Sequence, residues 1–190
     1  MKKIKSIFRN FLSKSNTNLI VAGSALAISA CALFISVQEV RIMRTQQTAT
    51  MYPYLTIGTR YSSDGFGIIL KNSGNGLARI NSYQVFNDNQ YFKDWLDVLQ
   101  ATMPEAKNIN YGIINTVGNI RNEMIAPGES KNLIFLKWTD ETREIEKRLK
   151  SLKVTVCYSS LLDEHWQVVD GIPVSLEQKC AENIKNEFGD

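Results

Sequence analysis

The sequence predicts a mainly β protein: an N-terminal transmembrane helix followed by an immunoglobulin-like β-sandwich with two inserted short helices. Three observations predict this class. An uncharged run of 19 residues, Leu19 to Val37, lies near the N-terminus. From Tyr54 onward apolar and polar residues alternate with a period of two between turn-forming clusters. Two stretches, near Phe92 and near Asp140, repeat instead with a helical period.

The apolar run Leu19–Val37 is long enough to cross a bilayer. A helix of this length spans about 28 Å, close to the thickness of the hydrocarbon layer. Ala25-Leu26-Ala27 has the residue types of a signal-peptidase site but lies in mid-run, and Ile28-Ser29-Ala30-Cys31 resembles a lipobox in which Cys31 would be lipidated. Because the run continues past both sites, we expect an uncleaved anchor, with the lipoprotein as an alternative.

Charge predicts the orientation of this anchor. Five of the 22 basic residues and none of the 19 acidic residues lie in 1–37, so residues 38–190 carry a net charge of −2. The positive-inside bias then places the tail, residues 1–18, in the cytoplasm and the large domain outside the cell inner membrane. A nucleic-acid partner is not expected, because the folded part has no excess of basic residues. The five are Lys2, Lys3, Lys5, Arg9 and Lys14.

Two short segments flank the anchor. In the tail, apolar residues recur at helical spacing, which fits either a basic amphipathic helix on an anionic leaflet or an unstructured leader that sets topology. After the anchor, residues 38–51 should continue the helix as a stalk until Pro53 stops it. We expect the domain to occupy 52–176 and a C-terminal tail 177–190. The apolar tail residues are Ile4, Ile7, Phe8, Phe11 and Leu12.

Seven or eight strands are expected in the domain. The segment 132–138 is apolar on both faces and is therefore expected to be central, whereas 108–125 is ambiguous and is expected to hold one or two weak strands. Turns are expected at 62–65, 72–76 and 127–128. The other expected strands are 54–58, 66–71, 78–86, 153–159 and 166–169.

Two helices are expected between these strands. Apolar residues from Phe92 to Met103 recur at helical spacing, and Pro104 follows. Thr139 can cap a second helix over about 140–152, whose pairs Glu144/Arg148 and Glu146/Lys150 are spaced i,i+4. We interpret this run of charges as a solvated helix face.

The sequence contains no constellation typical of an enzyme, so no catalytic, cofactor-binding or metal-binding residue is expected. His165 is the only histidine and follows Asp163 and Glu164, and we expect it to be exposed in a hairpin loop. Cys157 and Cys180 would share an oxidising compartment, and the spacing leaves both a disulfide and two free thiols open. Tyrosines gather in the first half of the domain, where packing is the default role and a binding surface the alternative. They are Tyr52, Tyr54, Tyr61, Tyr83, Tyr91 and Tyr111.

Four short motifs resemble a family of small uncharacterised bacterial single-pass membrane proteins with an extracytoplasmic β-sandwich domain. They are Tyr52–Ile57, Asn72–Ala78, Pro127-Gly128-Glu129, and Cys157–Ser160 with Trp166 beyond. The family more often has Trp at the position of Tyr52, and often has cysteines at the positions of Ser159 and His165. The resemblance therefore implies that a disulfide of the family is missing here. It implies no activity.

We expect an interaction module of the bacterial envelope, which binds an unknown protein partner or itself and is held to the lipid bilayer through Leu19 to Val37. The alternative is a membrane-acting effector of a toxin or phage-defence system, because small residues of the anchor permit close packing between helices. A role as an enzyme or small-ligand carrier is disfavoured.

Overall fold

The computed structural model describes residues 2–88, 90–104, 111–169, 171–180 and 184–189, with side chains from residue 17 onward. The chain forms two compact units, Met1–Gln47 and Thr48–Asp190. The first unit is helical and the second carries the sheets.

Helix α1 runs from Lys2 to Thr50. Its part Thr17–Thr50 is the one helix in the described residues that is long and apolar enough to cross a membrane, by length and composition. Its serines are accommodated within the helix, since Ser24 Oγ and Ser29 Oγ donate to the carbonyls of Val21 and Ala25, each at 2.8 Å. The helix ends before Pro53, as predicted. The backbone of residues 2–16 is helical, and the apolar face expected there lies outside the described side chains.

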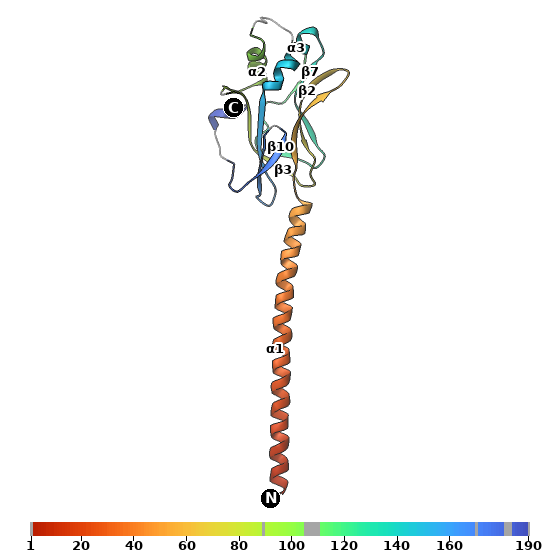
Figure 1. Ribbon diagram of the computed structural model, residues 1–190, viewed down its shortest axis with the longest axis vertical. Helices are drawn as coiled ribbons and strands as arrows, with labels where there is room; N and C mark the ends of the chain where they lie inside the picture. Colours follow the sequence, from red (N-terminus) through yellow and green to blue (C-terminus); the bar gives the residue numbers. More distant parts are fainter. Residues whose placement is uncertain (1, 89, 105–110, 170, 181–183, 190) are drawn as a thin grey trace. The chain divides into compact units, whose positions relative to one another are not determined.

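The second unit contains two antiparallel sheets (Figure 1). The four-stranded sheet has the order β1-β2-β7-β5, and the six-stranded sheet has the order β10-β9-β8-β3-β4, with β6 paired to β3. The four-stranded sheet consists of β1 (Leu55–Tyr61), β2 (Gly65–Asn72), β5 (Ile113–Thr116) and β7 (Ser130–Lys137). The six-stranded sheet consists of β3 (Ala78–Asn87), β4 (Gln90–Phe92), β6 (Met124–Ile125), β8 (Lys153–Ser159), β9 (His165–Val169) and β10 (Ile172–Leu176).

Both sheets contribute to one apolar core. Strand β8 illustrates why, because alternation along a strand places Val154, Val156 and Tyr158 together on the face that is buried in this core. Strand β7 is buried on both faces between β2 and β5, so the expectation of a central strand at 132–138 is confirmed. The mainly β class is likewise confirmed.

Two details of the expected elements were wrong. The described residues hold ten strands rather than seven or eight, because the short strands β4 and β10 add to the sheet edges. Helix α2 spans Trp95–Thr102 and does not begin at Phe92, which instead pairs with Val85 in β4. Asp94 caps α2 by accepting a hydrogen bond from the Asp97 amide. The ambiguous stretch forms β5 and β6 as two weak strands, while its residues 108–110 lie outside the described part.

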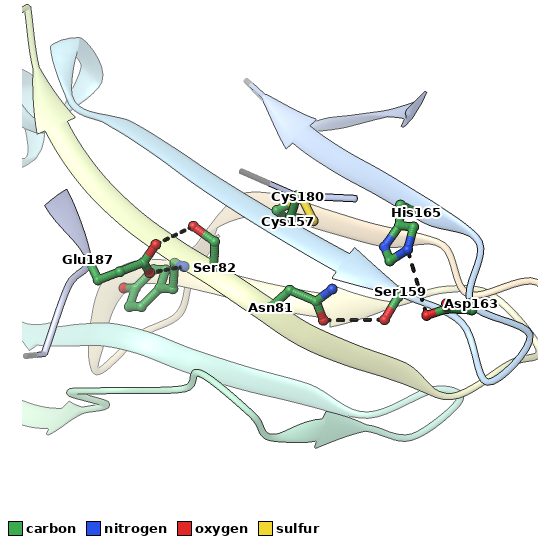
Figure 2. The surroundings of a disulfide bond; sticks show 9 residues. Asn81, Ser82, Cys157, Ser159, Asp163, His165, Cys180 and Glu187 are labelled. Carbon is green, nitrogen blue, oxygen red and sulfur yellow. Dashed lines mark hydrogen bonds and ion pairs between the residues drawn. A yellow bond between two sulfur atoms is a disulfide. The ribbon is translucent and has the colours of Figure 1, made fainter. Parts of the chain in front are cut away.

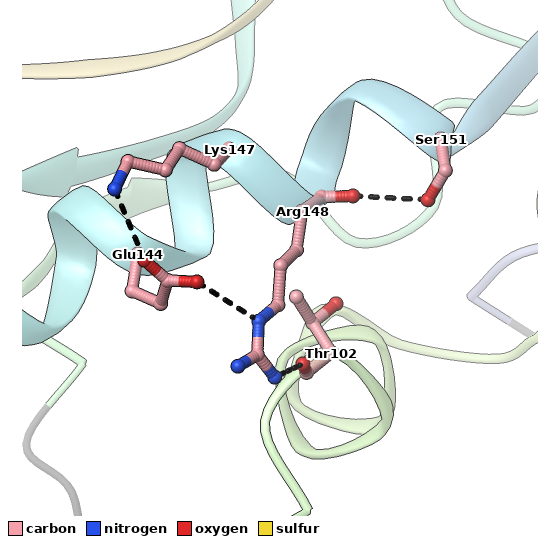
Figure 3. Close-up of polar contacts among 5 residues, drawn as sticks. All are labelled: Thr102, Glu144, Lys147, Arg148 and Ser151. Carbon is pink, nitrogen blue, oxygen red and sulfur yellow. Dashed lines mark hydrogen bonds and ion pairs between the residues drawn. The ribbon is translucent and has the colours of Figure 1, made fainter.

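Helix α3 (Asp140–Arg148) continues into a 3₁₀ turn, η1 (Leu149–Ser151), and matches the expected helix. Thr139 caps it in a capping box with Thr142. The predicted ion pairs are present, with Arg148 Nε 3.4 Å from Glu144 Oε1 (Figure 3) and Lys150 Nζ 3.5 Å from Glu146 Oε1. Arg148 also donates to the Thr102 carbonyl at 3.0 Å, which joins α3 to the end of α2.

The C-terminal segment belongs to the second unit, which extends past residue 176. After the 3₁₀ turn η2 (Ile184–Asn186), Glu187 and Phe188 are 2% and 1% exposed. The Glu187 carboxylate accepts from Ser82 Oγ at 2.6 Å and the Tyr83 amide at 2.8 Å, and the Phe188 amide donates to the Tyr83 carbonyl at 2.8 Å. Residues 187–188 thus satisfy the edge of β3 between its partners β6 and β4.

Candidate functional site

An exposed aromatic cluster lies where the β1–β2 hairpin meets the end of β7. Tyr61 is 57% exposed, and its ring stacks on Trp138 with a centroid distance of 6.4 Å and an interplanar angle of 8°. On the inner side, Phe66 packs against Trp138 at 4.8 Å. Arg143, the fourth residue of α3, places its guanidinium 5.0 Å from the centroid of the Trp138 ring. We call Tyr61, Trp138 and Arg143 the aromatic surface, and Phe66, which is 2% exposed, supports it from the core.

Local hydrogen bonds hold this cluster in place. Trp138 Nε1 donates to the Ser62 carbonyl at 2.9 Å, and the Trp138 amide donates to the Asp64 carbonyl at 3.2 Å, so the hairpin turn and β7 fix the indole. Tyr61 Oη donates to Glu146 Oε1 at 2.8 Å, and this bond is the main reason why the pKa of the Tyr61 phenol is raised. A preordered arrangement of Tyr, Trp and Arg loses little conformational entropy on binding a partner.

A cavity with a mixed polar and apolar lining, including Glu146 and Lys150, adjoins the aromatic surface. It has a volume of about 340 Å³ and lies between the inner side of β1–β2 and the segment from α3 to β8. Tyr61 belongs both to its wall and to the aromatic surface, and Phe66 lines the cavity as well. Its apolar lining is completed by Ile57, Ile68, Leu149, Leu152 and Val154. The combination offers a partner an exposed aromatic platform beside a recess for an apolar group.

His165 is not exposed, contrary to expectation. It is the first residue of β9 and 9% exposed, and its Nε2 lies 3.7 Å from Asp163 Oδ1 (Figure 2). Neither ring nitrogen has a hydrogen-bond partner within the described part of the chain. No group of three or more His, Cys, Asp and Glu suited to a metal occurs among the described residues. The geometry therefore permits an ion pair with Asp163 when the imidazole is protonated.

The structure also places the positions singled out by the family resemblance. Ser159 and His165 lie directly opposite each other in the β8–β9 pair. Neither residue has a thiol, and Ser159 Oγ donates a hydrogen bond to Asn81 Oδ1 at 3.2 Å. A disulfide does link Cys157 to Cys180, with 6.1 Å between the Cα atoms. This chain therefore has a disulfide cysteine two residues before Ser159.

The six tyrosines divide into packed and exposed residues. Tyr83 and Tyr111 are buried and Tyr52 is partly buried, whereas Tyr54, Tyr61 and Tyr91 are exposed. Both packing and surface display are therefore present, and Tyr61 alone joins the aromatic surface. Sequence reasoning did not find its partners Trp138 and Arg143, because Trp138 reads as a strand residue and Arg143 as part of a solvated helix. The one sequence feature that pointed to this cluster was the position of Trp138 immediately before the helix cap Thr139.

Comparison with known proteins identifies a family and nothing closer. No curated protein and no solved structure matches the chain. The family described as a domain of unknown function, DUF8453, matches residues 18–179, which is most of the chain and includes the apolar part of α1. The chain therefore belongs to the DUF8453 family.

Proposed function

We propose that this chain is a membrane-anchored protein-interaction module of a bacterial envelope, which binds a partner protein through the aromatic surface. The observation that carries the proposal is the stack of the exposed Tyr61 on the partly buried Trp138, with Arg143 over the same indole. Tyr, Trp and Arg are the residues most often found at the energetic centre of protein interfaces. The cavity beside them would receive an apolar side chain of the partner.

The strand order supports an immunoglobulin-like sandwich as the framework of this module. In constant-type immunoglobulin domains one sheet has the order A-B-E-D and the other contains C-F-G. Here β1, β2, β7 and β5 take the places of A, B, E and D, and β3, β8 and β9 take the places of C, F and G. Strands β4 and β10 are additions at the edges. Sandwiches of this kind commonly bind partners through loops and edges, which is where Tyr61 lies.

The proposed location rests on the N-terminal segment. Helix α1 is long and apolar enough to serve as an anchor in the inner membrane, and five basic residues precede its apolar part. The positive-inside bias would leave the second unit outside the cytoplasm. The Cys157–Cys180 disulfide suits that side, since disulfides persist in oxidising compartments.

The proposal is tested by photo-crosslinking in intact cells. A benzophenone amino acid replaces Tyr61 in the full chain, and the control places it at Leu161, which is 51% exposed in the β8–β9 turn. Light should produce an adduct of higher mass at Tyr61 and not at Leu161. Mass spectrometry of the adduct then separates a foreign partner from a second copy of the chain.

Two results would count against the proposal. Either no adduct forms at Tyr61, or the Leu161 control gives the same adducts, which would mean random collision. A second label at Arg143 should give the adduct of Tyr61, since both residues contact Trp138.

The alternative, a membrane-acting effector, is favoured by one observation. Apolar side chains of α1 such as Leu26 and Leu33 are 73% and 69% exposed, and small residues between them would permit close helix pairing. Under this alternative, induced overexpression would depolarise the membrane. The interaction module predicts no depolarisation.

A further inference from the structure

A second recess lies on the outer face of the six-stranded sheet, away from the apolar core. It has a volume of about 540 Å³, within the range of ligand pockets in proteins. Its floor is formed by β3, β8 and β9, and one wall is the segment from Leu176 to Cys180, which the disulfide ties to β8. Figure 2 shows the disulfide and Ser82 at this sheet.

Strand register places the floor residues in two rungs. Ser82 pairs with Cys157, which pairs with Gln167, and in the next rung on the same face Gln84 pairs with Thr155. With about 4.8 Å between strands and about 3.3 Å per residue, the backbones at Gln84 and Gln167 are about 12 Å apart. The two amides can therefore contact different units of one extended ligand.

The floor is polar but recessed. Ser82 and Thr155 are 6% and 7% exposed although their side chains are hydroxyls, and Gln84 and Gln167 are half-buried. Within the described part of the chain, neither glutamine forms a side-chain hydrogen bond. Each amide offers two donors and one acceptor, so the recess presents donors and acceptors side by side.

The charges around the recess exclude several ligand classes. Among the described residues one cation, Lys179, and one acid, Glu177, line it, so the lining gives neither an anion nor a cation a net counter-charge, and Lys179 also pairs with Asp163 at 3.5 Å. The buried Glu187 carboxylate bonds Ser82 and disfavours an anion nearby. An apolar ligand would leave the amides of Gln84 and Gln167 without partners, which is costly. The remaining class is neutral and rich in hydroxyl groups.

An aromatic ring completes the recess. Tyr91 lines it, is 40% exposed, and is held by Phe86 with a centroid distance of 5.1 Å. An exposed ring face packs well against the C–H face of a sugar ring, while its hydroxyl end stays in water.

We propose that this recess binds a neutral oligosaccharide, with Gln84 and Gln167 bonding hydroxyls on different sugar units and Tyr91 packing against a ring. The span of the two amides requires more than one unit. The inference is separate from the proposed protein-binding role, because the two sites share no residue.

Saturation-transfer NMR on the full chain tests this site. The protein is held in phosphocholine micelles, since maltoside detergents would carry the proposed ligand chemistry themselves. The probes are cellotetraose, maltotetraose and tetra-N-acetylchitotetraose, with glucose as a control for size. At least one tetramer should receive saturation at its ring protons, while glucose at equal concentration should receive much less.

Variants then assign the signal to the recess. Gln84→Ala combined with Gln167→Ala should weaken binding at least about tenfold, because two hydrogen-bonding amides are lost. Gln100→Ala, an exposed position on α2, should bind as the wild type does. Tyr91→Ala is a second, independent variant that should also weaken binding. Binding by a variant is compared only where its unfolding midpoint is unchanged and its disulfide is intact. The proposal would be overturned if none of the three tetramers received saturation. It would also be overturned if both recess variants bound a tetramer as strongly as the wild type does.

Discussion

Tyr83 and Tyr158 are both fully buried, and they differ in what their hydroxyls contact. The Tyr158 hydroxyl accepts from the Leu55 amide at 3.3 Å and lies 3.4 Å from the Pro53 carbonyl, to which it donates. The Tyr83 hydroxyl has no hydrogen-bond partner within the described part of the chain. A buried polar group without a partner costs free energy, whereas a partnered one does not.

The two corresponding phenylalanine variants should therefore differ in their effect on stability. Tyr83→Phe should leave the free energy of unfolding unchanged or raise it by up to about 1 kcal/mol. Tyr158→Phe should lower it by about 1–3 kcal/mol, since the Leu55 amide loses its acceptor. Urea unfolding followed by tryptophan fluorescence measures both. A larger loss for Tyr83→Phe than for Tyr158→Phe would show that the hydrogen-bond assignment is wrong.

Alkaline pH should destabilise the domain through the same residues. Burial raises the pKa of both phenols above 10.0 in the folded state. Between about pH 10 and the raised values the unfolded chain binds fewer protons, so stability is complete below pH 10 and falls as pH rises above it. The free energy of unfolding at pH 9 and pH 11 tests this, and Tyr83→Phe should show a smaller decrease. A decrease equal to that of the wild type would contradict the role of Tyr83.

His165 shows why single-residue environments were hard to predict. The neighbours Asp163 and Glu164 made a loop plausible, yet β9 starts one residue before the expected strand and places His165 opposite Ser159. A shift of one residue in a strand end moves a side chain from an exposed loop into a buried strand position. No local sequence pattern defines a strand end to within one residue.

Among the elements, the C-terminal segment was least visible in the sequence. Strand β8 and the capped helix α3 follow from alternation and from Thr139, because both signals are local. Glu187 and Phe188 instead fill a gap at the edge of β3, about a hundred residues earlier in the chain, so their role depends on tertiary structure alone. Strand β10 was missed because it is a short edge strand containing Pro173.

Removing the Glu187 carboxylate should destabilise the domain. Glu187→Ala leaves the Ser82 hydroxyl and the Tyr83 amide without their acceptor in a buried place, which should cost about 1–3 kcal/mol or more. Glu177→Ala is the matched control, since Glu177 is exposed. Equal midpoints for the two variants in thermal unfolding would contradict the buried role of Glu187.

The disulfide should contribute a similar amount to the free energy of unfolding as Glu187 does. Cys157→Ser combined with Cys180→Ser removes a crosslink over a sequence separation of 23 residues, which should lower the unfolding free energy by about 3 kcal/mol. Maleimide labelling without reductant should find Cys157 and Cys180 unreactive in the wild type. Two freely reactive thiols would remove the crosslink from the account.

At the scale of the whole molecule, the second unit should fold without the anchor. Residues 48–190 hold the complete core and the disulfide, so this fragment should be soluble and monomeric by light scattering. The full chain in mild detergent should associate in part, because the exposed apolar side chains of α1 can pack only on lipid or on other copies. A stable dimer of the fragment would instead place self-association in the sheets.

The two-part organisation was predictable because each part has a strong periodic signal: an uncharged run of 19 residues, and then alternation. The aromatic surface was not predictable from the sequence, because Tyr61, Trp138 and Arg143 come from three separate parts of the chain that only the fold brings together.

The central claim is that α1 anchors the second unit outside the cytoplasm, where a partner can reach the aromatic surface. Alkaline phosphatase, active only after export, and a fluorescent protein that folds only in the cytosol are each fused after Asp190 of the full chain. The account predicts an active phosphatase and a dark fluorescent protein. An inactive phosphatase together with a bright fluorescent protein would place the domain in the cytoplasm and contradict the account.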